Sequence, residues 1–368
     1  MINSSATAYL PFDTVWKMRI EHPYSLFVRE AAILWSCGQC PLDNLGNVLH
    51  PGDLLRQAHA VAGFIRRFLG DMQSQASSIG RLVVYYVKTA PGDAESLENL
   101  FHQEFGQSVQ VMPVAVPHFY YDGMLIEVDV FASDEKGGDT RFVDEESGLT
   151  LDVSNAGPFV WATVSSSSTL GQEIGSQLSR LLARANLSRD TLLAEQWFLP
   201  VGCAVPEAGL SVDQGRALQN AVRISDMDAG IMAELTFAKA PVSVSRRTET
   251  RFDSDGLSIS LRMTGDHFHV TALDASPDRG LVEQTASIMK AVETVFADAG
   301  LSFRDVRKAT TYYIAGSSAD DLHDNMSVRN RYYEKPGPAS TGLPVEGLQV
   351  LGAQISISLF GVMPRRGR

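Results

Sequence analysis

Three apolar runs along the chain have the residue content of buried strands. They are residues 81–87, 192–199 and 307–314, and the first and third contain a Tyr-Tyr pair followed by Val or Ile. Aromatic and β-branched residues are typical of strands because they pack well on a pleated surface. The runs recur about 115 residues apart, and such a period is typical of a chain built from repeated units.

An amphipathic helix is predicted before each of these runs. Apolar residues recur there at spacings of mainly three and four, which places them on one face of a helix. The three sets are Leu54, Ala58, Val61, Ile65 and Phe68; Leu170, Ile174, Leu178, Leu181 and Ala185; and Leu281, Ile288, Met289, Val292 and Val295. Asp53 precedes the first set and has the side chain of a helix N-cap.

The pattern divides the chain into three units. Each unit closes with an alternating, half-buried strand that begins at a glycine, at residues 123–130, 230–237 and 352–359. The polar segments 133–146, which contains Gly137 and Gly138, and 240–251 are predicted to be linkers or edge turns. We therefore predict unit one at residues 1–134, unit two at 135–240 and unit three at 241–368.

One unit reads as strand, strand, helix, strand, helix, strand, strand. The second helix is predicted at residues 94–105 in unit one and 319–333 in unit three. Unit two contains Pro206 and Gly209 in the corresponding stretch, so a full second helix is not expected there. Unit two is therefore predicted to be the degenerate copy.

Composition narrows the classes of partner. The 368 residues carry a formal net charge of −12, which disfavours binding to nucleic acid or to anionic lipid. No apolar run approaches the ~20 residues of a membrane span, and residues 1–20 do not read as a signal peptide. Three cysteines are too few for a disulfide scaffold. We expect a cytoplasmic protein with no nucleic-acid or membrane partner.

Residues 23–43 run from a Pro-Tyr pair to Cys37-Gly-Gln-Cys-Pro. This segment resembles the N-terminal signature of the RidA/YjgF (Rid) superfamily, which ends in a Ser-Gly-Gln-Ile-Pro turn. Residues 325–344 are similar to the family's segment from a helix to Pro-Ala-Arg-Ser, and Glu127 stands where the family has a glutamate on its last strand. The resemblance covers nearly the whole chain. It is strong in units one and three and weak in unit two.

The resemblance implies an α+β fold of three tandem chorismate-mutase-like, RidA-like units. Single-unit family members form trimers with ligand clefts between neighbouring subunits. Three units in one chain therefore suggest an intramolecular pseudo-trimer, because each unit alone would bury only part of its apolar surface. The alternative is three units arranged independently along the chain.

The resemblance also implies site residues. The family's imine and enamine deaminases use a tyrosine, the Ser-Gly turn, an arginine that holds the substrate carboxylate, and the last-strand glutamate. Here Tyr24 matches the tyrosine, Cys37 stands in the serine position, and Gly38 with Gln39 completes the turn. Glu127 is the candidate general base or water-orienting group, and we expect Tyr and Ile side chains around it to raise its pKa.

The other units depart from the family pattern. Glu234 is the candidate equivalent of the glutamate in unit two, whereas unit three has a serine. The arginine is missing from its expected places, which are Met112, Gln219 and Ser340. Arg223 could substitute if its stretch is a strand, although a surface role is also open. We therefore expect no ordinary deaminase activity on amino-acid-derived imines.

Two further patterns carry chemistry less directly. Cys37 and Cys40 form a Cys-x-x-Cys motif after a predicted strand rather than at a helix N-terminus, which disfavours redox chemistry. Cys37 could be a nucleophile or a buried, inert thiol. His267 and His269 share one strand face, but no third metal ligand is evident, so we expect no metal and no cofactor.

Two classes of function follow. The first is a RidA-like hydrolase or lyase of biosynthetic metabolism, acting in an inter-unit cleft on an imine, enamine or enol ether; a chorismatase-like enzyme, acting on an enol ether, is a variant of it. The second is a non-catalytic small-molecule-binding or scaffold protein. An enzyme should keep one well-formed polar pocket. The expected partner is a small-molecule substrate, and a homodimer of pseudo-trimers is also open.

Overall fold

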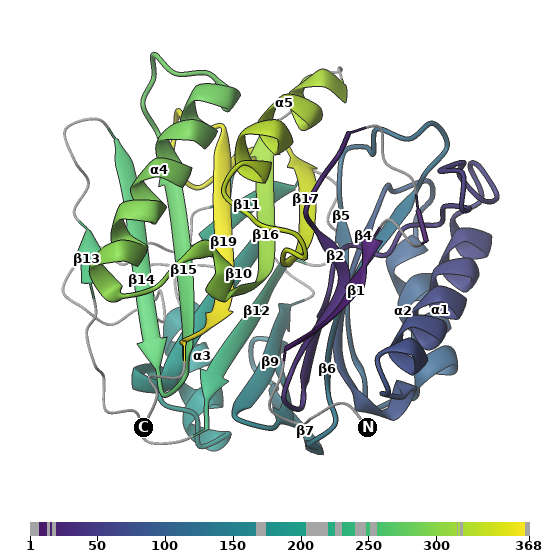
Figure 1. Cartoon of the computed structure of the whole chain (residues 1–368). Coiled ribbons are helices and arrows are strands. Elements are labelled where there is room, and N and C mark those ends of the chain that lie inside the picture. The colour runs from purple at the N-terminus through teal and green to yellow at the C-terminus, as the bar shows by residue number, and fades with distance from the viewer. Residues whose placement is uncertain are drawn as a thin grey trace.

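The computed structural model describes residues 7–12, 15–16, 20–166, 174–203, 220–224, 230–239, 248–250, 256–314, 316 and 319–364. These residues form a mixed α+β structure. Its strands lie at the centre, with helices α1 and α2 on one side and α4 and α5 on the other (Figure 1).

Residues 1–134 contain six strands and two α-helices among the described residues. They are β1 (Ala8–Pro11), β2 (Ser25–Glu30), β3 (Ile33–Ser36), α1 (Leu54–Asp71), β4 (Ile79–Tyr86), α2 (Asp93–Phe105), β5 (Gln110–Ala115) and β6 (Ile126–Ser133).

Residues 135–240 contribute β7 (Lys136–Asp144), β8 (Leu149–Ala156), β9 (Phe159–Ser166), α3 (Ile174–Arg184), β10 (Leu192–Pro200), β11 (Asn220–Ile224) and β12 (Ile231–Ala238). Residues 241–368 contribute β13 (Thr248–Thr250), β14 (Leu257–Thr264), β15 (His267–Asp274), α4 (Leu281–Ala299), β16 (Val306–Ile314), α5 (Ala319–Asn330), β17 (Ala339–Val345), β18 (Gly347–Leu348) and β19 (Ile355–Val362).

The strands form two sheets. The larger has the order β13-β14-β15-β19-β16-β17-β2-β3-β6-β4-β5, with β1 paired to β2, and the smaller has the order β18-β11-β10-β12-β9-β8-β7. The larger sheet joins units one and three where Ala339 of β17 pairs with Ser25 of β2. The smaller joins units two and three where β18 pairs with β11. Strand pairing therefore crosses two unit boundaries.

The same strand register occurs three times. Strands β4, β10 and β16 each pair in parallel with one neighbour and antiparallel with another, and each antiparallel pair contains an irregularity near its start. Just after the irregularity, Arg81 pairs with Phe131, Ala194 with Thr236, and Lys308 with Phe360. Counting from these pairs defines equivalent positions in the three units.

Four residues further along these strands, three equivalent aromatic side chains meet. The ring centroids of Tyr85, Phe198 and Tyr312 are 6.5, 6.5 and 6.1 Å apart, and the two tyrosine hydroxyls are hydrogen-bonded at 2.9 Å. The three units thus contribute one ring each to a nearly equilateral triangle in the core.

The sequence predicted most of these elements. All five apolar residues predicted for the first helix are buried in α1, and Asp53 caps it by accepting a hydrogen bond from the backbone N–H of Arg56 at 3.1 Å. The three apolar runs are β4, β10 and β16. The predicted second helices are α2 and α5.

Some predicted boundaries were wrong. The segment 133–146, which was predicted to be a linker or an edge turn, contains β7, an edge strand that pairs with β8 and includes Gly137. In units one and three, the closing strands begin three residues after the leading glycine. Gly123 and Gly352 have φ angles of 75° and 91°, so they form the preceding turn. The expected loss of the second helix in unit two, at 202–219, falls largely outside the described residues.

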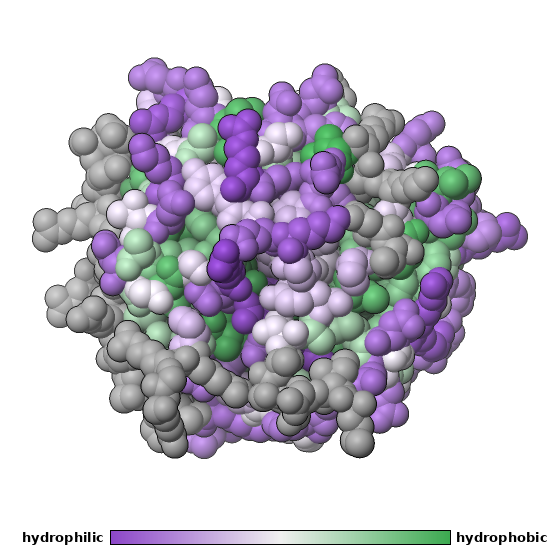
Figure 2. Space-filling view, viewed as in Figure 1, coloured by the Kyte–Doolittle hydropathy of each residue, from purple (hydrophilic) through white to green (hydrophobic). Residues whose placement is uncertain are grey.

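The surface in Figure 2 mixes polar and apolar residues, and its apolar residues form several separate areas rather than one broad patch. Among the described helices, none combines the length and apolar content that a membrane crossing needs.

Candidate active site

A cavity of about 100 Å³ lies between units one and three. Unit one contributes Tyr24, Gly38 and Glu127. Unit three contributes Tyr313 of β16 and Arg329 of α5, together with other residues of α5 and β17. The cavity is therefore formed by two segments that are far apart in the sequence. It brings together three of the eight site residues predicted from the sequence.

Glu127 lies on β6, and its side chain lies close to the backbone of Gly38. A Cβ atom added at Gly38 would lie 1.6 Å from Oε1 of Glu127, so no side chain fits there while the glutamate keeps its place. The pairing is also irregular at this point. Trp35 pairs with Phe131, but Gln39 pairs with Val128, so four steps on one strand match three on the other. Such bulges commonly re-aim a side chain near an active site.

Burial raises the pKa of Glu127 to about 8, and the negative charge of Asp129 adds to the effect. The cation of Lys308 and a hydrogen bond with the Cys40 thiol oppose the increase. The raised pKa expected from the sequence is therefore present. Its size has a consequence, because Glu127 holds a proton at neutral pH and is poised as an acid rather than as a base.

Arg329 of α5 supplies a cation to the same cavity. Its side chain is 2% exposed. Its guanidinium donates hydrogen bonds to Oδ1 of Asn325 at 2.9 and 3.1 Å and to Oγ1 of Thr311 at 3.1 Å. Its side-chain partners among the described residues are therefore an amide oxygen and a hydroxyl, and none is a carboxylate. A buried arginine without an acidic partner is costly unless an anion joins it.

The remaining walls are largely aromatic. Phe12, Phe119, Tyr120 and Tyr121 line the cavity with Tyr313. Burial raises the pKa of Tyr24, while the Arg329 cation opposes the increase. A ligand here would contact mainly apolar surface, with few polar groups to orient it.

The structure places the two cysteines differently. Cys40 lines the cavity and interacts with Glu127, whereas Cys37 is 1% exposed and belongs to the hydrophobic core. Burial raises the pKa of the Cys37 thiol well above its usual value, so the reactive thiolate is disfavoured. The nucleophilic role considered for Cys37 is therefore not supported by its surroundings.

Gln39 does not line the cavity either. It is fully buried, and its side-chain amide donates hydrogen bonds to the carbonyl oxygens of Cys37 at 3.0 Å and Leu26 at 3.4 Å. These bonds hold the turn that carries Gly38. The role of Gln39 is thus to position the backbone rather than to bind substrate.

Three other predicted residues lie elsewhere. Met112 is buried in the hydrophobic core beside β4. Arg223 of β11 donates to the carbonyl oxygen of Cys203 in unit two. Glu234 forms an ion pair with Arg81, with Oε2 and Nη2 3.0 Å apart.

The register explains the misassignment of Glu234. Glu127 lies four residues before Phe131, and the corresponding residues before Thr236 and Phe360 are Met232 and Ser356. Glu234 is instead equivalent to Asp129. Among the three copies, only unit one therefore has a carboxylate at the Glu127 position.

The other chemical patterns form no metal centre. Among the described residues, no group of three or more His, Cys, Asp and Glu side chains is arranged to hold a metal ion. His269 shares a hydrogen bond with Ser358 at 2.7 Å, and the ring of His267 packs against Phe159.

Sequence reasoning missed Arg329, although it lies inside the 325–344 segment singled out for its resemblance. The search for an arginine followed strand positions, whereas Arg329 comes from the preceding helix. One available signal was the spacing of Asn325 and Arg329, which places them on one helix face as a hydrogen-bonding pair.

Comparison with known proteins gives structural matches alone. No family model and no curated protein matches the chain. A Rid-family protein of unknown function from Yersinia pestis is 21% identical, with a TM-score of 0.26, and the match covers 30% of this chain and 86% of that protein. A YjgF/YER057c/UK114 family member from Mycobacterium tuberculosis is 17% identical, with a TM-score of 0.28, and the match covers 35% and 99%.

A YjgF-family protein from Neisseria meningitidis is 14% identical, with a TM-score of 0.28, and the match covers 36% of this chain and 97% of that protein. Each of these three matches covers 30–36% of this chain.

Proposed function

We propose that this chain is a small-molecule enzyme of the Rid type that adds water to a carboxylate-bearing imine, enamine or enol ether. The observation that carries the proposal is the pairing of two groups in one apolar cavity. Glu127 holds a proton at neutral pH, and Arg329 is a buried cation whose neighbours include no carboxylate within ion-pair distance among the described residues.

Arg329 would bind the substrate carboxylate. A guanidinium presents donors in a fork that matches a carboxylate, and such charge-assisted pairs are strong and directional. Asn325 and Thr311 already orient the group, so little conformational freedom remains to be lost on binding. The helix arginine would thus replace the strand arginine that the family pattern lacks here.

Glu127 would donate a proton to the unsaturated bond. For an imine, protonation of nitrogen makes the carbon electrophilic, and the resulting carboxylate can accept a proton from the attacking water. The adduct then breaks its carbon–nitrogen bond, so that R₂C=NH and H₂O give R₂C=O and NH₃. An enol ether or enamine would be protonated on carbon and hydrated in the same way.

We propose further that the three residue ranges 1–134, 135–240 and 241–368 are RidA-like units assembled as an intramolecular pseudo-trimer. Three features support this arrangement: the repeated register, the triangle of Tyr85, Phe198 and Tyr312, and the strand pairing across unit boundaries. The cleft used for catalysis would be the one between units one and three.

The expectation of no activity on amino-acid-derived imines rested on the absence of an arginine. The structure removes the basis for that expectation, because Arg329 lines the cavity. Imines generated from phenylalanine, leucine and 2-aminobutanoate by an amino-acid oxidase are therefore the first substrates to assay. Semicarbazide traps the imine, so an active enzyme lowers trapping and raises the yield of 2-oxo acid. The aromatic walls favour the larger side chains.

Glu127→Gln and Arg329→Gln are the test variants. We expect Glu127→Gln to lower the rate by about 10²–10⁴-fold, the range typical of a positioned acid. If wild-type protein does not raise the yield of 2-oxo acid above the uncatalysed level, either from these imines or from enol-ether analogues such as a 2-alkoxyacrylate, the catalytic proposal is overturned. Carboxylate binding without turnover would then support the non-catalytic alternative.

A further inference from the structure

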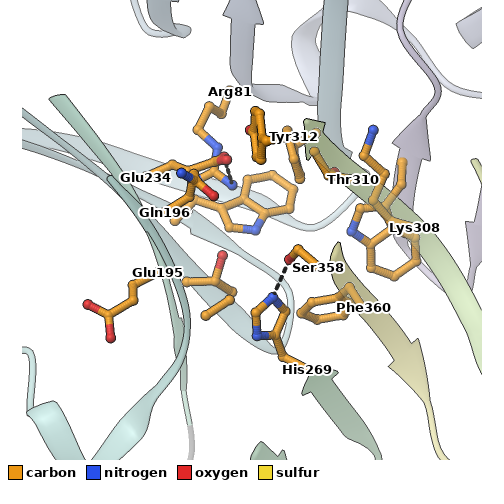
Figure 3. Close-up of a pocket in the computed structure, with 15 residues that line it drawn as sticks. Arg81, Glu195, Gln196, Glu234, His269, Lys308, Thr310, Tyr312, Ser358 and Phe360 are labelled. Atoms are coloured by element: carbon orange, nitrogen blue, oxygen red, sulfur yellow. Dashed lines mark hydrogen bonds and ion pairs between the residues drawn. The ribbon is translucent and has the colours of Figure 1, made fainter. Parts of the chain in front are cut away.

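A second cavity, of about 60 Å³, lies among all three units and is separate from the candidate active site. Its lining comes from equivalent positions of the repeated register. Arg81, Ala194 and Lys308 form one such set. We call this cavity the central chamber (Figure 3).

Two inter-unit ion pairs border the chamber. Arg81 of unit one pairs with Glu234 of unit two at 3.0 Å, and Lys308 of unit three pairs with Asp129 of unit one at 2.8 Å. The acidic partners are equivalent too. Asp129 lies two residues before Phe131, which pairs with Arg81, and Glu234 lies two residues before Thr236, which pairs with Ala194. The chain thus repeats one ion pair at two unit boundaries.

The third boundary lacks this pair. The equivalent of the cation is Ala194 of unit two, and the equivalent of the acid is Ser358 of unit three. The adjacent wall is also smaller. Units one and two have Trp35 and Trp161 at one equivalent position, whereas unit three has His269 there. Three large or charged positions have therefore been replaced by smaller ones on the same side of the chamber.

Polar groups remain at this side with unused bonding capacity. Gln196 is 6% exposed, and its Oε1 has no hydrogen-bond partner among the described residues. Nε of the fully buried Arg81 is in the same situation. Figure 3 shows Gln196, Glu234 and Arg81 together at one side of the chamber, facing His269 and Ser358. A buried acceptor and a buried donor without partners indicate that something polar belongs between them.

The charges around the chamber are already balanced. Glu195 pairs with Arg262 at 3.2 Å, as the two acids above pair with Arg81 and Lys308. Burial holds the pKa of His269 near 3, so its ring is neutral. A charged ligand would find no unpaired counter-charge and would lose its hydration on entry.

We propose that the central chamber binds a small, uncharged, planar carboxamide-type molecule in the sector where the third ion pair is missing. Its N–H groups would donate to Oε1 of Gln196, and its carbonyl would accept from Nε of Arg81. Trp35, Trp161 and Phe360 supply flat apolar walls. A chamber of about 60 Å³ holds about four to six water-sized groups, so the ligand has a similar number of non-hydrogen atoms.

Acetamide, acetate and acetamidinium provide a matched set of probes, because they share a shape and differ in charge. Saturation-transfer NMR with the full chain carrying Arg329→Gln, in which acetate has no carboxylate site in the other cavity, should show the strongest transfer to acetamide. Ala194→Arg combined with Ser358→Glu rebuilds the third pair on the pattern of Arg81 and Glu234, fills the sector, and should remove the signal. Gln196→Met keeps the side-chain length but not the acceptor, and should weaken the signal by about fivefold.

Arg329→Gln serves as the control, since it alters the other cavity and should leave acetamide binding unchanged. Equal signals from wild type and the rebuilt-pair variant would overturn the proposal. So would stronger transfer to acetate or acetamidinium than to acetamide in Arg329→Gln, which removes the carboxylate site proposed in the other cavity, or a crystal structure grown with acetamide in which the chamber holds only water. If the double variant does not fold, as judged by circular dichroism, Gln196→Met alone decides.

Discussion

A proton on Glu127 should couple protein stability to pH. The pKa of this group is about 8 in the folded chain, against an ordinary value of 4.5. Between these values the folded state binds more protons than the unfolded state, so stability is full below about pH 4.5 and falls as pH rises toward 8. Over that window the free energy of unfolding should lose up to about 1.4 kcal/mol per pH unit from this group.

Urea unfolding at pH 5.5, 7 and 8.5 measures this dependence. In Glu127→Gln the decline attributable to this group should disappear, because the amide does not titrate. Glu95→Gln, a change at an exposed position of α2, should keep the wild-type slope. Parallel pH profiles for wild type and Glu127→Gln would show that the carboxyl is ionised at neutral pH.

Gly38→Ala should displace Glu127, since the added methyl would overlap its carboxyl group. We expect a loss of about 1–3 kcal/mol, the usual cost of overpacking, together with loss of turnover. Gly63→Ala on α1 is the matched control, because a Cβ there meets no atom within 4 Å. Activity in Gly38→Ala equal to that of Gly63→Ala would remove Glu127 from the mechanism.

The candidate site could be predicted from the sequence only where its residues are contiguous or follow a strand pattern. Tyr24, Gly38 and Glu127 were assigned from the resemblance to Rid-superfamily motifs, which are contiguous in the sequence, and all three line the cavity. Arg329 and Tyr313 come from unit three, and no local pattern says which unit faces which. The position of Cys40 at the cavity and of Cys37 in the core follows from the bulge between Trp35 and Gln39, which alternation of residues along a regular strand does not reveal.

Strand β16 is tied to β6 by the buried pair of Lys308 and Asp129, whose side chains are 5% and 2% exposed. Lys308→Met should cost about 3–5 kcal/mol, because it leaves Asp129 buried without a counter-charge. Combining it with Asp129→Leu should recover most of that loss. Chemical denaturation of the two variants measures both effects.

The exposed pair of Arg304 and Glu334 is the comparison, with side chains 72% and 67% exposed. Arg304→Met should leave the denaturation midpoint unchanged, because solvent screens the pair. If Lys308→Met behaved like Arg304→Met, the buried pair would not hold the two units together.

Helices and strands with a regular apolar pattern could be predicted from the sequence. The first helix of each unit was predicted from apolar spacing, and the central strands from their aromatic and other apolar content. Strand β7 was missed because it lies at a sheet edge and most of its central residues are exposed, so its composition resembles that of a linker.

The whole chain should form its three-fold arrangement without exchanging strands between molecules. Light scattering should therefore give a monomer, or a dimer of complete rings. An obligate trimer of whole chains with exchanged strands would contradict the single-chain assembly.

The asymmetry of the three units could not be predicted from the sequence, because the missing third ion pair is visible only once the strand register defines which residues are equivalent.

The central claim is that Arg329 binds a substrate carboxylate beside Glu127. Calorimetric titration with a 2-oxo acid, the product class of the proposed reaction, tests it most directly. Wild type and Arg331→Gln, a change at an exposed neighbour, should bind alike, whereas Arg329→Gln should bind about tenfold to a hundredfold more weakly. Arg329→Lys, which keeps the charge but not the fork, should lie between them. Equal affinity in wild type and a folded Arg329→Gln would contradict the account.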